Sequence, residues 1–217
     1  MRILALDSAV GRCSVTLVSE TGVMAEHCDT PRGQGGILAD MLQRVLGQAE
    51  RRPAELDLIA VTVGPGSFTG IRGGIALARG MALAAEIPVV GVTIGEAFTE
   101  AFPLLGQRAL WTALPSRPGR VFIETGDTVL SLAVTDLPMP TGPVALAGTA
   151  ALDVASRLAA RGANVMLTDA RFPSGVQIAE AGAKRLRGEL PPRDAVPLYV
   201  DAPEAKPQRA VPAPATP

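Results

Sequence analysis

A glycine-rich loop is the segment of this sequence with the clearest capacity for chemistry. It reads Gly64-Pro65-Gly66-Ser67-Phe68-Thr69-Gly70 and follows a continuous apolar run at 58–63 that is typical of a buried strand. A loop between a strand and a helix can hold an anion through backbone N–H groups and the helix N-terminus. No Gly-Lys-Ser/Thr follows, and the glycine spacing differs from the dinucleotide fingerprint. The loop indicates either a weak phosphate site at Gly64, Gly66 and Ser67 or a tight turn with small-residue packing.

A second candidate is the pair Asp7-Ser8, which ends the first apolar run and precedes a hairpin at Gly11. The arrangement resembles the first phosphate loop of the actin-like ATPase superfamily, where an acidic residue at a strand end serves a metal. A lone aspartate at a strand end also commonly forms a turn. Both interpretations of Asp7 and Ser8 stay open.

The residue types that other enzyme classes need are absent or isolated. The only histidine is His27, so the chain offers no two-histidine metal site, and Cys13 and Cys28 lack metal-ligand spacing. No G-x-S-x-G elbow accompanies His27, which we interpret as a structural or exposed histidine within a strand. We therefore expect no catalytic residue and no metal site.

The helix expected over 70–85 is poor in bulky side chains. Each interior glycine costs about 0.5–1 kcal/mol relative to alanine, so the close approach of another backbone is the expected compensation. The neighbour is either a partner molecule or the chain's own sheet and helix at 37–50. Arg72 serves a ligand, a partner or only solvent. One face of this helix carries Gly70, Gly73, Gly74, Leu77 and Met81.

The elements that position these residues follow from hydrophobic periodicity. The first half reads β-β-β-α-β-α-β, which is the pattern of a ribonuclease-H-like lobe with a mixed sheet and helices on its faces. The expected elements are strands at 2–7, 13–18 and 23–28, a helix at 37–49, a strand at 58–63, a helix at 70–85 and a strand at 88–93.

The second half indicates a further α/β lobe. We therefore divide the chain into an N-terminal lobe (1–95), a C-terminal lobe (96–201) and a proline-rich flexible tail (202–217). The expected elements are a helix near 95–105, a strand at 109–114, a hairpin over 121–134 turning at Gly126-Asp127, a strand at 144–147, a helix at 150–161, a strand at 164–167 and a helix at 175–187.

Composition restricts the environment of the chain. It has 217 residues, of which 47% are hydrophobic and 19% charged, and its net charge of −1 predicts weak binding of nucleic acid by the chain alone. Two cysteines are too few for a secreted scaffold, no leader-like N-terminus is recognisable, and no apolar run reaches the length of a membrane span. We expect a cytoplasmic protein that does not enter membranes.

Several segments together resemble the TsaB (YeaZ) family, a bacterial subunit of the threonylcarbamoyl-adenosine tRNA modification machinery. The resemblance implies a two-lobed actin-like ATPase (ribonuclease-H-like) fold and a non-catalytic dimerisation subunit required for transfer of a threonylcarbamoyl group to a tRNA adenosine. The matching segments are 3–18, 58–83 with Gly-Pro-Gly-Ser-Phe-Thr-Gly-Ile-Arg-Gly-Gly, Ile87-Pro88-Val89-Val90-Gly91-Val92 and Pro197-Leu198-Tyr199-Val200.

The resemblance also implies partners. The catalytic paralogue TsaD carries an H-x-x-x-H metal pair, and the ATPase TsaE is a third partner. ATP is then used by the complex, no cofactor is bound by this chain alone, tRNA is contacted only through the complex, and a homodimer in isolation stays open. Carried over by position, the partner interface comprises Ile37, Leu38, Met41, Val45, Gly70, Arg72, Gly73, Gly74, Leu77 and Met81.

The chain departs from the family at two places. Arg32-Gly33-Gln34-Gly35-Gly36 replaces a usual His-Ser-Glu stretch, and Tyr199-Val200-Asp201 replaces Tyr-Leu-Arg. The alternative function is an actin-like ATPase or small-molecule kinase acting through Asp7, Ser8 and the 64–70 loop, which ATP binding by the isolated chain would reveal. A peptidase, suggested only by the naming of related proteins, lacks its metal pair.

Overall fold

An antiparallel meander opens the first of two sheets in the computed structural model, which describes residues 1–19, 22–28 and 34–200. Hydrophobic alternation produces this meander, and the fully apolar run at 58–63 becomes a parallel strand beside it. The sheet order is β3-β2-β1-β4-β5. Its strands are β1 (Ile3–Asp7), β2 (Cys13–Ser19), β3 (Gly22–Cys28), β4 (Leu58–Gly64) and β5 (Val89–Thr93).

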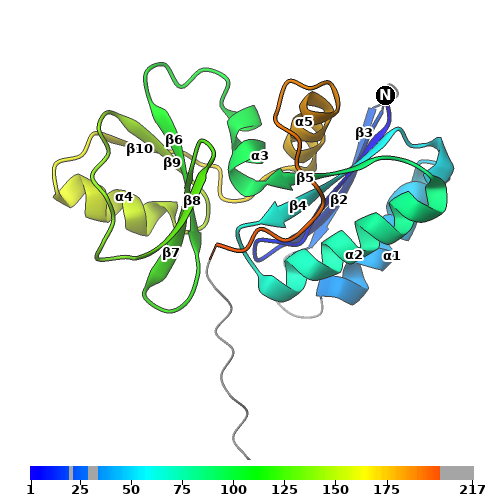
Figure 1. Cartoon of the computed structure of the whole chain (residues 1–217), viewed down its shortest axis with the longest axis horizontal. Coiled ribbons are helices and arrows are strands. Elements are labelled where there is room, and N and C mark those ends of the chain that lie inside the picture. Colours follow the sequence, from blue (N-terminus) through cyan, green and yellow to red (C-terminus); the bar gives the residue numbers. More distant parts are fainter. Residues whose placement is uncertain (20–21, 29–33, 201–217) are drawn as a thin grey trace, which may run out of the picture.

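The second sheet repeats this connectivity. Three antiparallel strands are again followed by two parallel ones, in the order β10-β9-β6-β7-β8. The two sheets form two lobes that lie side by side (Figure 1), so the two-lobed actin-like, ribonuclease-H-like fold is confirmed. The strands are β6 (Ala109–Pro115), β7 (Arg120–Thr125), β8 (Thr128–Ala133), β9 (Val144–Ala147) and β10 (Val165–Leu167).

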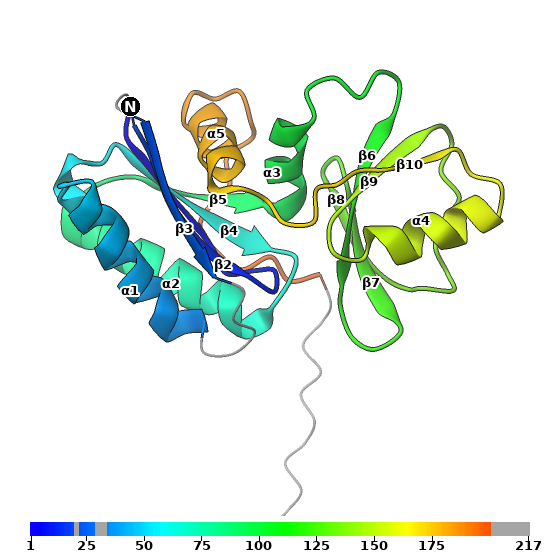
Figure 2. The same ribbon diagram turned by 180° about the vertical axis from the view of Figure 1, so that it is seen from behind.

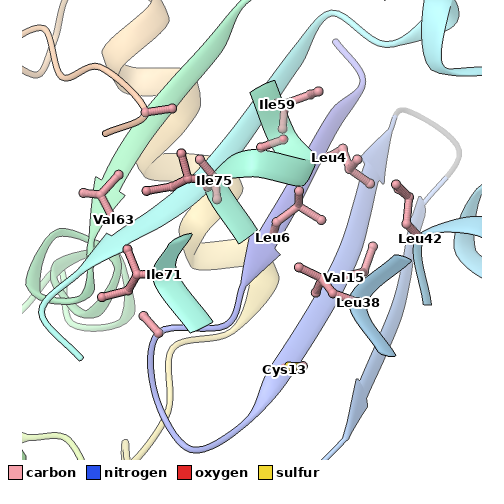
Figure 3. Packing of buried hydrophobic residues seen from close by; sticks show 14 of the residues in the cluster. Leu4, Leu6, Cys13, Val15, Leu38, Leu42, Ile59, Val63, Ile71 and Ile75 are labelled. Carbon is pink, nitrogen blue, oxygen red and sulfur yellow. The ribbon is translucent and has the colours of Figure 1, made fainter. Parts of the chain in front are cut away.

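Two helices cover one face of the first sheet. They are α1 (Gln34–Gln48) and α2 (Phe68–Ala85), which lie side by side below the strands in both views (Figures 1 and 2). Their apolar sides enclose the largest core, where leucines of α1 and isoleucines of α2 meet the side chains of β1, β2 and β4 (Figure 3). A short 3₁₀ turn, η1 (Pro53–Glu55), connects α1 to β4.

The other face of the first sheet is covered from the far end of the chain. α5 (Gly175–Leu186) packs on β1, β4 and β5 and against α3 (Ile94–Ala101). The sequence predicts that the helix at 175–187 belongs to the C-terminal lobe, but it packs on the first sheet. The reason is that the apolar side of α5 closes a sheet face that α1 and α2 leave open. The second sheet is covered by α4 (Ala151–Ala160).

Local signals explain where the helices begin and end. α2 starts two residues before the expected position because the Ser67 hydroxyl caps its N-terminus. α3 ends at Ala101, well before the expected 105, and Pro103 follows it. Within the described residues, no helix is both long and apolar enough to cross a bilayer. The expected tail from residue 202, and the departures at Arg32, Gly33 and Asp201, lie outside the described residues.

Candidate functional site

Asp7 points into the first lobe. It ends β1 with 2% of its surface exposed, and its Oδ1 accepts hydrogen bonds from the Thr62 hydroxyl at 2.6 Å and the Ala9 N–H at 2.9 Å. Burial raises the pKa of Asp7 to about 6, although both hydrogen bonds lower it. The Asp7 side chain therefore acts locally to join β1 and β4.

The first hairpin and the glycine-rich loop are bound to each other. The Ser8 hydroxyl donates to the Gly70 carbonyl at 2.8 Å, and the Ser67 N–H donates to the Ala9 carbonyl at 2.6 Å. A Cβ atom at Gly66 would lie 2.0 Å from that carbonyl oxygen, so this position accepts only glycine. The structure thus brings the two predicted phosphate-loop segments into direct contact.

These segments form one wall of a cleft between the lobes with a volume of about 1030 Å³. Gly66 and Ser67 line it, whereas the predicted residues Asp7, Ser8 and Gly64 do not. Its charged lining residues are arginines, and no carboxylate lines it within the described part of the chain. The cleft therefore offers positive charge and hydroxyl groups but no acidic metal ligand.

A C-terminal strap, residues 193–200, reaches this cleft and was not foreseen from the sequence. The Leu198 N–H donates to the Val63 carbonyl at 2.9 Å, which lays the strap beside β4. The Tyr199 hydroxyl then accepts a hydrogen bond from Arg72 at 2.8 Å. The Arg72 guanidinium also lies 3.6 Å above the centre of the Phe68 ring. Arg72 is thus held at the mouth of the cleft by two aromatic residues.

The structure corrects half of the predicted partner interface. Leu38, Met41 and Val45 are at most 1% exposed and belong to the core beneath α1. Gly70 and Gly74 are also buried, and a Cβ at Gly74 would lie 2.4 Å from the Ser8 hydroxyl. The physical reason is that the apolar face of each helix packs on its own sheet, so these five residues do not form a surface.

The other five predicted residues reach the surface of the chain. Arg72 is exposed, and the remaining four are partly exposed: Ile37, Gly73, Leu77 and Met81. Next to them, α2 exposes positions that the sequence analysis did not select. These include Ala76, Gly80 and Leu83, and the side chain of Leu83 is 82% exposed. The outward face of α2, defined here as Thr69, Arg72, Ala76, Arg79, Gly80 and Leu83, is the surface that the structure leaves uncovered.

A second group of polar residues lies where the lobes meet, and the sequence analysis missed it. The buried carboxylate of Glu124 on β7 accepts hydrogen bonds from the Thr93 hydroxyl and, at 2.8 Å, from the Gly95 N–H at the start of α3. Burial raises the pKa of Glu124 to about 7. The only available sequence signal was the Thr93/Glu96 capping box.

Neighbouring Glu96 is held by two arginines. Arg185 donates to it at 2.6 Å and Arg193 at 3.2 Å. Although burial opposes the effect, hydrogen bonds from Arg185 and Thr93 lower the pKa of Glu96. Throughout the described ranges, no three His, Cys, Asp or Glu side chains are grouped to hold a metal. The backbone of His27 lies in β3, opposite Ser14.

A family model and several curated proteins match part of this chain in sequence. Residues 32–109, over a third of the chain, match the family model described as TsaD, tRNA N6-adenosine threonylcarbamoyltransferase. The Escherichia coli (strain K12) tRNA threonylcarbamoyladenosine biosynthesis protein TsaB is 37% identical over 123 residues, covering 56% of this chain and 53% of the relative. The Bacillus subtilis (strain 168) protein of that name is 32% identical, covering 43% and 41%. The chain thus matches about half the length of its curated relatives, or less.

Solved structures show the same fold over nearly the whole chain. A Pseudomonas aeruginosa protein described as similar to peptidase YeaZ has a TM-score of 0.76 at 24% identity, covering 92% of this chain and 99% of that one. YeaZ from Pseudomonas aeruginosa gives 0.74 at 24% identity, with 91% and 100% covered. The chain is thus similar in sequence to TsaB proteins over part of their length, and it shares the fold of the YeaZ structures.

Proposed function

We propose that this chain is a non-catalytic subunit of the machinery that makes threonylcarbamoyladenosine in tRNA, and that it binds and activates a catalytic paralogue of the TsaD type. Support comes from the names of its relatives and from the match of residues 32–109 to the TsaD family itself. The ATPase TsaE is proposed as a further partner. The complex is proposed to act in the cytoplasm. The net charge of −1 agrees with contact to tRNA only through the complex.

The outward face of α2 carries this proposal. Only two of the 18 residues of α2 are charged, Arg72 and Arg79, although the helix exposes one side. Surface helices normally place charged and polar residues on the side that faces water. A Cβ at Gly80 would meet no atom within 4 Å, so this face has room for a close neighbour. An exposed helix face with two arginines and no acidic residue among small and apolar ones suits a second helix from another protein.

Gly80→Leu tests the proposed face. The substitution adds bulk in open space, so we expect an unchanged or higher melting temperature because a helix glycine is removed. Affinity for the TsaD homologue of the same organism, measured by titration calorimetry, should fall at least tenfold. Ala159→Leu, an exposed position on α4 in the other lobe, is the matched control and should bind normally. Normal binding by Gly80→Leu would show that α2 is not the docking face.

A reconstitution experiment tests the function itself. TsaD and TsaE homologues with tRNA, ATP, threonine, bicarbonate and the enzyme that forms the threonylcarbamoyl-adenylate should modify tRNA only when this chain is added. The chain by itself should transfer no threonylcarbamoyl group. Modification at an undiminished rate without it would refute the scaffold role.

The geometry gives less support to the alternative of an ATPase or kinase. That alternative assigns a role in the cleft to Asp7, whereas Asp7 is buried and bonded to Thr62 and Ala9. ATP turnover by the isolated chain that disappears in Asp7→Asn, with the variant still folded, would favour the alternative instead.

A further inference from the structure

Glu124 connects the two lobes through buried hydrogen bonds. It lies on β7 of the second lobe, 4% exposed, while its donors, the Thr93 hydroxyl and the Gly95 N–H, belong to the end of β5 and the start of α3. α3 stands at the boundary between the lobes (Figure 2). A Cβ at Gly95 would lie 2.4 Å from the Glu124 carboxyl carbon, so glycine at this position is what lets the carboxyl approach.

The surroundings of Glu124 disfavour a negative charge. Neighbouring Glu96, whose own charge is retained by Arg185 and Arg193, repels a negative charge on Glu124. Arg193 also attracts the Glu124 carboxylate, but burial outweighs this attraction and the two hydrogen bonds. Keeping Glu124 ionised while the interface between the lobes is closed therefore costs free energy. Exposure of the carboxylate to water would remove that cost.

A small cavity gives the proton a path. It has a volume of about 190 Å³ and borders Glu124, with Glu100 and Asp127 as the other acidic groups besides Glu96. Glu100 is paired with Lys184 at 2.7 Å. Thr112, directly opposite Glu124 on β6, also lines the cavity, and its buried hydroxyl has no hydrogen-bond partner in the described residues. Because directly opposed residues on paired strands place their side chains on the same face, this hydroxyl lies on the same side of the sheet as Glu124.

We propose that Glu124 is a proton-controlled latch between the lobes: they are held together more firmly when its carboxyl is protonated, and they separate more readily when it is ionised. Separation would bring the carboxylate into water, which favours its charged form. The inference does not depend on the proposed function, because it concerns the interface between the lobes and not the face of α2.

The size of the effect follows from linkage between proton binding and opening. The pKa of Glu124 is about 7 in the closed arrangement and has a reference value of 4.5 in water. The closed form therefore binds the proton more tightly, and rising pH between these values favours opening. For these two pKa values, the ratio of closed to open molecules should fall about 70-fold between pH 5 and pH 8.

Amide hydrogen exchange of the full chain, followed by NMR, measures this ratio. The protection factor of the Gly95 amide, which already corrects for intrinsic exchange, is divided by the protection factor of the Ala60 amide in the first sheet. This ratio should fall between pH 5 and pH 8. Glu124→Gln, which stays neutral, should keep the acid value throughout. Glu100→Gln, on the same cavity, is the control and should behave as the wild type.

A second measurement on the unaltered protein makes the test independent of whether the variants fold. The carboxyl ¹³C shift of Glu124 reports its titration, and its midpoint should coincide with the midpoint of the change in Gly95 protection. A flat protection profile while Glu124 titrates would overturn the latch. A pH dependence that persists in folded Glu124→Gln would also overturn it.

Discussion

The Ser8 hydroxyl lies beside Gly74, 2.4 Å from where a Cβ atom of residue 74 would stand. The same hydroxyl donates to the Gly70 carbonyl at 2.8 Å, so it cannot move without losing a buried hydrogen bond. The hydrogen bond of Ser8 and the glycine at position 74, which are far apart in the sequence, therefore explain each other. The glycine is needed in α2 because the first hairpin packs against that turn of the helix.

Gly74→Ala should destabilise the isolated protein. Alanine recovers about 0.5–1 kcal/mol of helix propensity, but overpacking against Ser8 costs about 1–3 kcal/mol. Urea unfolding followed by circular dichroism measures the net loss. Ser8→Ala removes the obstacle, so the pair Ser8→Ala/Gly74→Ala should be more stable than the sum of the two single effects implies. Full additivity would contradict the proposed contact.

Arg185→Ala should be among the most destabilising single changes in the chain. Arg185 is buried and donates to Glu96, to the Pro191 carbonyl and to the Gly91 carbonyl. Its removal leaves the largely buried Glu96 carboxylate, 15% exposed, with Arg193 as its remaining arginine among the described residues. Breaking a fully buried pair typically costs about 3–5 kcal/mol, so we expect a loss toward the lower end of that range. Arg187→Ala is the control two residues later, because the ion pairs that Arg187 forms among the described residues are exposed, and its loss should leave stability nearly unchanged. Equal melting temperatures for the two variants would disprove this difference.

Asp7 should make the folded protein less stable as the pH rises from about 4 to about 6. Its pKa rises from 3.8 to about 6 on folding, so the folded state binds the proton more tightly. The contribution of Asp7 to stability is therefore largest below about pH 4 and is lost as pH rises to about 6. In Asp7→Asn this loss is absent, so the stability of the variant relative to the wild type should increase over that range. A constant difference between pH 4 and pH 7 would contradict the prediction.

The C-terminal strap should contribute to the stability of the first lobe. Ending the chain after Pro192 removes the hydrogen bond from the Gly91 N–H to the Arg193 carbonyl and that from the Leu198 N–H to the Val63 carbonyl. It also removes one partner of Glu96. We expect a melting temperature several degrees below that of a chain ending after Val200, at about 1 kcal/mol for each lost hydrogen bond. Identical melting curves would show that the strap does not support the lobe.

The order of helices and strands was determined largely by the sequence itself. The alternation at 13–18 and the apolar run at 58–63 each lie within a single strand, and all but the last residue of the 3.6-residue period at 37–49 lies within α1. Such patterns depend on which side of an element is apolar, and neighbouring residues are sufficient to show that. The first-half order β-β-β-α-β-α-β also predicted the mixed sheet correctly.

Only the tertiary structure decided which partner each apolar face meets. Leu38, Met41 and Val45 have the same helical spacing whether they face a sheet or another protein, and their burial shows that they face the sheet. The return of α5 to the first lobe likewise has no local signal, because its complement is the uncovered face of a sheet more than 80 residues earlier.

The polar contacts between residues far apart in the sequence were the hardest feature to predict from the sequence. Glu124 meets Gly95 and Thr93 across some 30 residues of chain, and Arg72 meets Tyr199 across 127. Nothing in the local composition distinguishes these side chains from ordinary surface residues. Their burial, their pKa values and their hydrogen bonds arise from the way the two lobes and the strap are brought together, which is a property of the packed chain and not of any segment within it.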